Sequence, residues 1–337
     1  MDDPLRRSSR AVLVVVALAV AGIGIWGIHD LRVLPYWGFG TTGGRVSSVT
    51  AGGPAERAGF QVGDSLLLDG GIDPRDVRLL NQRPWPRIGD GRSYLLRRGN
   101  QTAEATLVFS RMPSYDIRFY GTKAVIGVLF LVTGLVVLLG AGGGAAAPFS
   151  LLCDSAGVAM MTEPYLATVV LERLWLLFYL AWIGAGFAFL FHFTSVFPRV
   201  KRWSERHWFV PLAYTPAALA LLALLPVLYS GAAAPRVLTA AILLVPVAYL
   251  GASVALLVRD YALSGRDERR ALGLDVMLAG SVLAFVPMIV ALLFMLAAPS
   301  VQLPGRPYYP FTLALLVASF AYACLRQRAA PRLASPA

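Results

Sequence analysis

The chain has little charge. Asp, Glu, Lys and Arg make up 15% of its 337 residues, whereas a soluble domain usually carries about 25%. The charges are also unevenly placed, because long apolar stretches alternate with short arginine-rich patches. This pattern excludes an ordinary soluble protein and is typical of a chain that is embedded in a lipid bilayer.

Histidine and cysteine are scarce. The three histidines, His29, His192 and His207, are scattered along the chain, and none lies in the His-Glu-x-x-His pattern of an intramembrane zinc protease. The two cysteines, Cys153 and Cys324, lie in apolar segments, where we expect them to be small buried hydrophobic residues rather than a disulfide framework. The sequence predicts no metal site and no cofactor.

A catalytic constellation is also absent from the sequence. His192 and Ser195 share one helix face, but a serine nucleophile needs a base and an oxyanion site as well. No such site is evident, so we interpret the pair as packing residues. A phosphate-binding glycine loop of the Walker type is missing. We therefore predict that the protein is not an enzyme.

The net charge of +11 at pH 7 raises the question of nucleic-acid binding. Much of the excess lies in short loops beside apolar spans, which is the usual composition of the cytoplasmic loops of membrane proteins. We predict no nucleic-acid partner.

Apolar runs of about 20 residues mark candidate membrane spans. The clear ones are Ala11–Ile28, Ala124–Leu139, Val169–Phe193, Phe209–Leu228, Val237–Val258, Val276–Ala297 and Phe311–Leu325. The first run follows three arginines, as in a signal peptide, but it is longer than the usual apolar region of one. No small-x-small cleavage site follows it, which favours an uncleaved anchor.

This set of spans conflicts with the positive-inside rule. If the amino terminus is cytoplasmic, the basic segments Arg199–Arg206, Arg259–Arg270 and Arg326–Arg332 fall outside. One more crossing over Ala145–Met161, which is apolar apart from Asp154, places all three inside. We therefore predict a polytopic α-helical membrane protein with about eight transmembrane helices and both termini in the cytoplasm.

The segment Asp30–Tyr120 lies between the first two spans and is polar and rich in glycine. It is long enough to form a small extracytoplasmic domain. We predict a helical turn at Pro54–Ala58 that ends at Gly59, a hairpin turn at Gly43–Gly44 and a second short helix at Asp76–Gln82. Strands are predicted at Tyr36–Thr41, Arg45–Val49, Ser65–Leu68, Ser93–Arg97 and Ala103–Phe109.

The run from Val49 to Leu66, Val-Thr-Ala-Gly-Gly-Pro-Ala-Glu-Arg-Ala-Gly-Phe-Gln-Val-Gly-Asp-Ser-Leu, resembles the core signature of bacterial PDZ domains. The resemblance covers roughly Leu34 to Ser110 and implies a small α+β PDZ-like domain that is inserted between two spans. Domains of this family bind an extended peptide as an added strand.

The resemblance also implies which residues bind that peptide. Its carboxylate would lie against a loop of the form aromatic-x-Gly-hydrophobic, where backbone amides are the donors, and this form is matched by Tyr36, Trp37, Gly38 and Phe39. The other wall of the groove would be the second short helix, with Asp76, Leu79 and Leu80. The alternative is a PDZ fold that serves only as a spacer or a dimer contact.

The order of the remaining segments supports a second resemblance. His192–Pro198 closes one span, Arg266–Gly273 leads into a span with Pro287, and Pro310–Arg326 forms the last one. Together with the inserted domain, they resemble the membrane sensor half of bacterial histidine kinases of the competence quorum-sensing type. The resemblance implies a sensor in the bacterial cytoplasmic (inner) membrane. The phosphoacceptor and ATP-binding segments of that family have no counterpart in the sequence, so autophosphorylation is not implied.

Ionisable residues within membrane spans are costly and are therefore candidates for function. These candidates are Asp154, Glu172, Arg173 and His192. Asp154 is the deepest, and we expect Glu172 to be its partner. Snorkelling of a side chain near a helix end is the alternative explanation for the others.

We divide the chain into a cytoplasmic segment with the first span (1–29), the PDZ-like domain (30–120), a membrane bundle (121–326) and a basic tail (327–337).

The main hypothesis is a sensor that binds a peptide or another ligand outside and signals to a separate cytoplasmic protein. The alternative is a membrane-anchored scaffold for exported peptides or proteins. The expected partners are a peptide or protein C-terminus, a cytoplasmic signalling protein and membrane lipids. A transporter is a third and weaker alternative.

Overall fold

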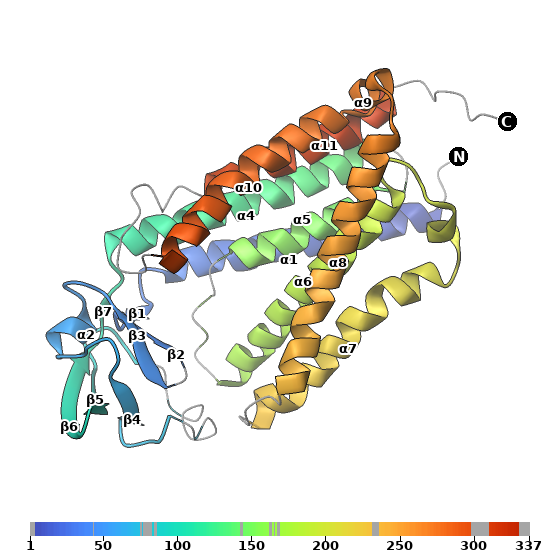
Figure 1. Cartoon of the computed structure of the whole chain (residues 1–337). Coiled ribbons are helices and arrows are strands. Elements are labelled where there is room, and N and C mark those ends of the chain that lie inside the picture. Colours follow the sequence, from blue (N-terminus) through green and yellow to red (C-terminus); the bar gives the residue numbers. More distant parts are fainter. Residues whose placement is uncertain are drawn as a thin grey trace.

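In the computed structural model the chain forms a bundle of helices with a small sheet domain at one end (Figure 1). The structure describes residues 4–42, 44–74, 76, 83, 86–141, 144–161, 164, 166, 169–230, 236–297 and 310–329. The end of the bundle away from the sheet domain is called the distal end below. The first turns of α1 and the last turns of α11 lie there (Figure 1).

The helices of the bundle form where the apolar runs predict them. They are α1 (Pro4–Asp30), α4 (Ser114–Gly140), α5 (Ala146–Met160), α6 (Val169–Val196), α7 (Phe209–Ser230), α8 (Arg236–Leu263), α10 (Leu274–Ala297) and α11 (Leu313–Ala329). The short helix α9 (Arg266–Leu272) and the 3-10 turn η1 (Arg202–Glu205) lie in connections between them. The weakly apolar segment Ala145–Met161 is helical as well, as α5.

Four helices of the described residues are long and apolar enough to cross a membrane: Arg10–Asp30, Ser114–Gly140, Leu174–Val196 and Leu244–Leu263. Shorter apolar helices occupy Ala146–Met160, Phe209–Leu225, Leu274–Ala284 and Pro310–Arg326. Many large apolar side chains on these helices are exposed, with Val15, Leu139 and Leu244 each more than 60% accessible. An apolar surface of this extent fits contact with lipid, so the fold agrees with the membrane protein that the composition predicts.

The helices form two groups (Figure 1). In one group α1, α4, α5, α10 and α11 run side by side, and in the other α6, α7 and α8 pack together and diverge from the first group toward the sheet domain. The groups meet along α5 and α6 and in an aromatic cluster, where the ring of Phe193 lies 5.3 Å from Phe149, 4.9 Å from Phe197 and 5.9 Å from Phe320.

Small residues let α5 pack closely against its neighbours. A Cβ atom at Gly134 of α4 would lie 2.8 Å from the Cβ of Cys153, and a Cβ at Gly186 of α6 would collide with Ser155. The hydroxyl of Ser155 donates to the carbonyl of Trp182 at 2.8 Å. α5 is thereby held between α4 and α6, and it also packs against α1.

Five of the described strands form the main antiparallel sheet of the domain, in the order of the chain. They are β2 (Phe39–Thr42), β3 (Arg45–Val49), β4 (Ser65–Asp69), β5 (Gly91–Arg98) and β6 (Gln101–Val108). Four of the five predicted strands are present within a few residues of the expected bounds. The short helix α2 (Pro54–Arg57) follows β3, and the core consists of Val46, Phe60, Tyr94, Leu96 and Leu107 with their neighbours.

One expected strand is wrong. Tyr36–Thr41 does not form a single strand, because Gly38 has a φ of +77°, a left-handed conformation that interrupts an extended run. The segment is divided into β1 (Pro35–Tyr36), which pairs with β7 (Ser110–Arg111), and β2, which pairs with β3.

The turns around α2 follow the prediction more closely. Gly59 and Gly63 have φ values of +85° and +95°, so the helix ends and the next strand begins at glycines. The carboxylate of Asp64 accepts hydrogen bonds from the amide of Gln61 at 2.8 Å and from Arg98 at 2.9 and 2.8 Å. Of the expected second helix, Asp76–Gln82, all but Asp76 lies outside the described residues.

Candidate ligand-binding site

The loop Tyr36–Phe39 connects β1 to β2 and is held by backbone hydrogen bonds. The amide of Thr50 donates to the carbonyl of Gly38 at 2.8 Å, and the amide of Ala55 donates to the carbonyl of Trp37 at 3.1 Å. Within the described part of the chain, the amides of Trp37 and Gly38 donate no hydrogen bond. Gly38 is buried, and a buried amide without an acceptor is costly, so a ligand that accepts hydrogen bonds suits this loop.

The strand that follows the loop is also available for binding. β2 is at one end of the strand order, so among the described strands it pairs only with β3. An edge strand presents a row of backbone groups that an added strand can pair with. The side chain of Phe39 also contributes to the domain core, because its ring packs 4.8 Å from Phe60 and 5.9 Å from Tyr94.

A cavity of about 620 Å³, the outer cavity, lies between this loop and the helix bundle. Its volume is within the range of about 300–1,000 Å³ that is usual for small-ligand sites. The lining residues come from both parts of the protein: Trp37, Gly38 and Phe39 from the loop, Asp116, Tyr120 and Lys123 from α4, and Glu172, Trp175 and Tyr179 from α6. A ligand in this cavity would contact the sheet domain and both groups of helices at once.

The lining of the outer cavity is aromatic with a few charges. Trp37, Tyr120, Trp175 and Tyr179 supply apolar surface, while Lys123 and two carboxylates supply charge. Such a lining favours an amphipathic ligand, because aromatic rings bury apolar groups and the few polar groups fix orientation.

Tyr36 links the loop to α4. Its hydroxyl lies 2.7 Å from the hydroxyl of Thr50, and burial raises the pKa of Tyr36 above its ordinary value. The hydrogen bond with Thr50 opposes this rise in the pKa, and the nearby carboxylate of Asp116 adds to it. Since Asp116 belongs to the first turn of α4, this contact connects the sheet domain with the bundle.

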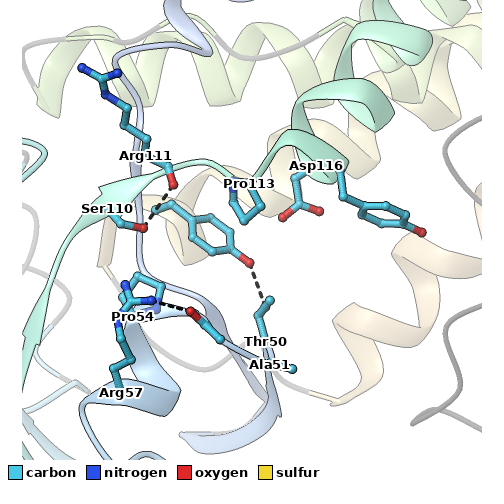
Figure 2. Close-up of a pocket in the computed structure, with 12 residues that line it drawn as sticks. Thr50, Ala51, Pro54, Arg57, Ser110, Arg111, Pro113 and Asp116 are labelled. Carbon is cyan, nitrogen blue, oxygen red and sulfur yellow. Dashed lines mark hydrogen bonds between the residues drawn. The ribbon is translucent and has the colours of Figure 1, made fainter.

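A second cavity of about 660 Å³ lies on the other side of Tyr36, Thr50 and Asp116. Figure 2 shows Thr50 and Asp116 at its rim, together with Arg57 of α2 and Arg111 of β7. Tyr36, Thr50 and Asp116 line both cavities and therefore form the wall between them.

The structure brings part of the predicted ligand site together. Tyr36, Trp37, Gly38 and Phe39 form one loop beside the outer cavity. Leu79 and Leu80, which were expected to form the opposite wall, lie outside the described residues, and Asp76 does not line the outer cavity.

The intramembrane candidates have different environments. Asp154 is 0% accessible, and neither of its carboxyl oxygens has a hydrogen-bond partner among the described residues. The expected pairing of Asp154 with Glu172 is therefore wrong, because Glu172 faces the outer cavity instead. Nδ1 of His192 lies 2.8 Å from the hydroxyl of Tyr214 and joins α6 to α7. The side chain of Arg173 is outside the described set.

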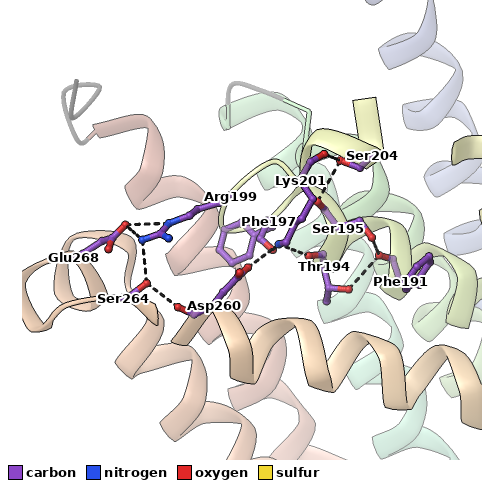
Figure 3. A network of polar contacts seen from close by, with 10 residues as sticks. All are labelled: Phe191, Thr194, Ser195, Phe197, Arg199, Lys201, Ser204, Asp260, Ser264 and Glu268. Atoms are coloured by element: carbon purple, nitrogen blue, oxygen red, sulfur yellow. Dashed lines mark hydrogen bonds and ion pairs between the residues drawn. The ribbon is translucent and has the colours of Figure 1, made fainter. Parts of the chain in front are cut away.

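A polar network at the distal end was missed by the sequence analysis (Figure 3). Nζ of Lys201 lies 2.6 Å from Oδ2 of Asp260 and also donates to the carbonyls of Thr194 and Phe197. Arg199 pairs with Glu268 of α9. We call Arg199, Lys201, Asp260, Ser264 and Glu268 the distal clasp, because they join the end of α6 to α8 and α9.

Burial lowers the pKa of Lys201, and the hydrogen bond to Asp260 opposes that effect. The sequence shows Lys201 and Asp260 only as members of two separate basic segments, so their pairing could not be identified from charge alone.

In the described part of the chain, no three His, Cys, Asp or Glu side chains gather in a way that would hold a metal ion. The site is thus characterised by backbone amides, aromatic rings and a few charges. The chain matches no protein-family model, and no curated protein is significantly similar to it.

Proposed function

We propose that this protein is a membrane sensor that binds an extracytoplasmic ligand with a free carboxylate, such as a peptide C-terminus, and transmits binding to a separate cytoplasmic protein. The observation that carries the proposal is the outer cavity, which is lined by the loop Trp37–Phe39 and by the outer ends of α4 and α6. One ligand can therefore act on the sheet domain and the bundle together.

Our proposal that the sheet domain is PDZ-like rests on three features. The domain has an edge strand after a glycine loop, a helical turn that begins at Pro54, and glycine turns at Gly59 and Gly63. The amides of Trp37 and Gly38, which find no acceptor among the described residues, suit a carboxylate, because successive backbone N–H groups form an anion-binding concavity. Peptide pairing along β2 would add main-chain hydrogen bonds.

The proposed topology has eight crossings, with the sheet domain outside and both termini in the cytoplasm. In support, the first turns of α1, the helix α9 and the last turns of α11 all lie at the distal end (Figure 1). These segments carry Arg10, Arg266, Arg270 and Arg326, so basic residues of the short segments that flank the helices lie on one side, as the positive-inside rule requires, whereas a long loop such as the sheet domain can cross regardless of its charge. α5 is the additional crossing.

The two helix groups suggest how binding is transmitted. They diverge toward the sheet domain and are joined near the distal end by the aromatic cluster around Phe193. Within one group the distal clasp ties α6 to α8, and the pair of Arg199 with Glu268 ties it to α9, the connection that leads into α10. A ligand that fits the outer cavity better at one spacing of α4 and α6 shifts the bundle toward that spacing. The distal ends of α6 and α8 then present a different surface to the cytoplasmic partner.

The binding step is tested with the full-length protein in lipid nanodiscs and a library of short peptides, each with a free or an amidated C-terminus. Free peptides are expected to bind at least about tenfold more tightly, which corresponds to about 1.4 kcal/mol. Gly38→Asp, which places a carboxylate in the loop, should abolish binding. Gly99→Asp is the matched control, because Gly99 also has a positive φ (+59°) but lies in a turn with open space around it. Equal binding of free and amidated peptides would contradict the proposal.

The alternative, a scaffold that only tethers its ligand, differs in the response of the helices. Spin labels at Ile117 of α4 and Leu171 of α6, both exposed, report the distance between the helix groups. A sensor changes this distance when the peptide binds, whereas a scaffold binds the peptide with no change.

A further inference from the structure

Asp154 is the one carboxyl group that the structure places in the middle of the membrane bundle, as far as its residues are described, and the proposed function does not use it. It lies near the middle of α5 and is 0% accessible, and both carboxyl oxygens lack a hydrogen-bond partner among the described residues. One turn earlier, Ser150 is also 0% accessible, and in the same part of the chain its hydroxyl has no partner. Two unsatisfied polar groups on one face of a central helix need an explanation.

The surroundings of Asp154 are apolar. On the turn before it, Cys153 and Ser150 pack against Gly134 of α4. On the turn after it, Val158 lies in a cluster with Val20 of α1 and Leu131 of α4. Residues one turn apart share a helix face, so Asp154 lies where α5 meets α1 and α4.

The titratable groups of the helices that pack against α5 lie mainly toward helix ends. They are Arg10, His29 and Asp30 on α1, Tyr115, Asp116, Arg118, Tyr120 and Lys123 on α4, and Glu172, Tyr179 and His192 on α6, with the side chains of Arg6, Arg7 and Arg173 outside the description. Inside the span, the titratable neighbour of Asp154 is the buried thiol of Cys153. No cation of the described residues pairs with Asp154.

From this geometry we propose that Asp154 is a proton-binding site whose occupancy controls the packing of α5 against α1 and α4. A neutral carboxyl group can remain in this apolar site, whereas an isolated carboxylate cannot be buried there without a large cost. When the proton leaves, the carboxylate needs water or a cation, and α5 must separate from a neighbour to admit it. Binding of a proton at Asp154 therefore affects the packing of the bundle, in addition to binding of a ligand in the outer cavity.

A proton fits this site better than a metal cation. Hard cations such as Mg²⁺ and Ca²⁺ take about six to eight oxygen ligands, and the described surroundings of Asp154 supply one carboxyl and the hydroxyl of Ser150. α5 also packs closely against α4 at Gly134 and Gly157, on the turns that flank Asp154.

The test uses the full-length protein in lipid nanodiscs and dicyclohexylcarbodiimide, an apolar reagent that reacts with protonated carboxyl groups. Peptide mass spectrometry should find the adduct on Asp154, and labelling should fall about tenfold for each pH unit above the midpoint of the titration. A water-soluble carbodiimide should instead label Asp267, which is exposed on α9, and not Asp154. Asp154→Asn should carry no adduct at this position.

The effect on packing is read from thermal unfolding of the same samples across pH. The wild type should lose stability relative to Asp154→Asn as the pH rises, because the wild type must keep a proton on Asp154 in order to stay packed. Absence of the apolar adduct at every pH overturns the proposal, and so do parallel stability profiles of the two proteins. If Asp154→Asn does not fold, labelling of the wild type alone decides.

Discussion

The ammonium group of Lys201 lies 2.6 Å from the carboxylate of Asp260 and about as close to the carbonyl of Thr194 (2.7 Å). One side chain therefore caps the end of α6 and ties it to α8. Both partners are only 10% accessible, so each charge depends on the other for compensation. Together with the other residues of the distal clasp, this contact ties together the distal ends of two helices that carry no common sequence motif.

Removing one partner of this pair is expected to be costly. Lys201→Met should lower the free energy of unfolding by about 3–5 kcal/mol, because it leaves the charge of Asp260 buried without a partner. The double variant Lys201→Met with Asp260→Leu should recover most of that loss. Reversible unfolding in detergent micelles measures both. Arg202→Met, which changes an exposed neighbour, is the control, and an equal loss in that variant would contradict the prediction.

The sheet domain should be stabilised by Asp64 in a pH-dependent way. Hydrogen bonds from Arg98 hold the pKa of Asp64 below its usual range. The folded state therefore binds this proton less readily than the unfolded state, so the stabilisation is present above about pH 4. It is lost as the pH falls through the lowered pKa. Asp64→Asn should lower the free energy of unfolding at neutral pH by about 1–3 kcal/mol and flatten the acid limb of the stability curve.

The matched control for Asp64 is Glu104→Gln, an exposed carboxylate on β6 of the same domain. Unfolding of the full-length protein is followed by the near-UV signal of the domain across pH. If Glu104→Gln flattens the acid limb as much as Asp64→Asn does, the acid sensitivity does not come from the pair of Asp64 and Arg98.

The contact between Tyr36 and Thr50 should be measurable as a coupling energy. A double-mutant cycle with Tyr36→Phe and Thr50→Val is expected to give about 0.5–1.5 kcal/mol, the usual range for one hydrogen bond. Because Tyr36 also contacts Asp116 electrostatically, Tyr36→Phe should in addition reduce the ligand-dependent change between α4 and α6. A coupling energy of zero would show that the two hydroxyls act independently.

The end of α9 should tolerate only glycine. Gly273 caps this helix with a φ of +69°, and a Cβ there would lie 3.2 Å from the Cα of Ala323 on α11. Gly273→Ala is expected to destabilise the protein by about 1–2 kcal/mol, the cost of a left-handed conformation in a residue with a Cβ. Gly265→Ala, at the other end of α9, has an ordinary φ of −67° and open space, and it should change the melting temperature little.

The sequence predicted the helices of the bundle and the strands of the sheet domain because both have local signatures. Apolar runs predict the helices. The distribution of basic residues between the two sides of the membrane adds Ala145–Met161 to them, and this segment forms α5. The turn at Gly59 is confirmed by its φ of +85°. These features depend on residues that are close in the chain, so one sequence is enough to find them.

Packing between helices could be predicted only in part. The small-x-x-x-small spacing favours Gly184 with Ala188 and Gly280 with Ala284 as close-packing pairs. A Cβ at Gly280 would collide with Ser319 of α11, as this spacing predicts, but a Cβ at Gly184 would meet open space, and Gly186 makes the tight contact on α6. The partner of Asp260 is Lys201, a residue 59 positions away. The relative rotation of helices decides such contacts, and apolar runs without strong periodicity do not specify it.

The pairing of β1 with β7 places Tyr36 opposite Ser110, so the chain enters and leaves the sheet domain at one point. α1 ends shortly before β1, and α4 begins shortly after β7. The domain is in this respect a removable module: a short turn that joins Tyr36 directly to Ser110 would bridge the same gap. α1 and α4 would keep their spacing, and the bundle could be studied, or fitted with another receptor domain, without being redesigned.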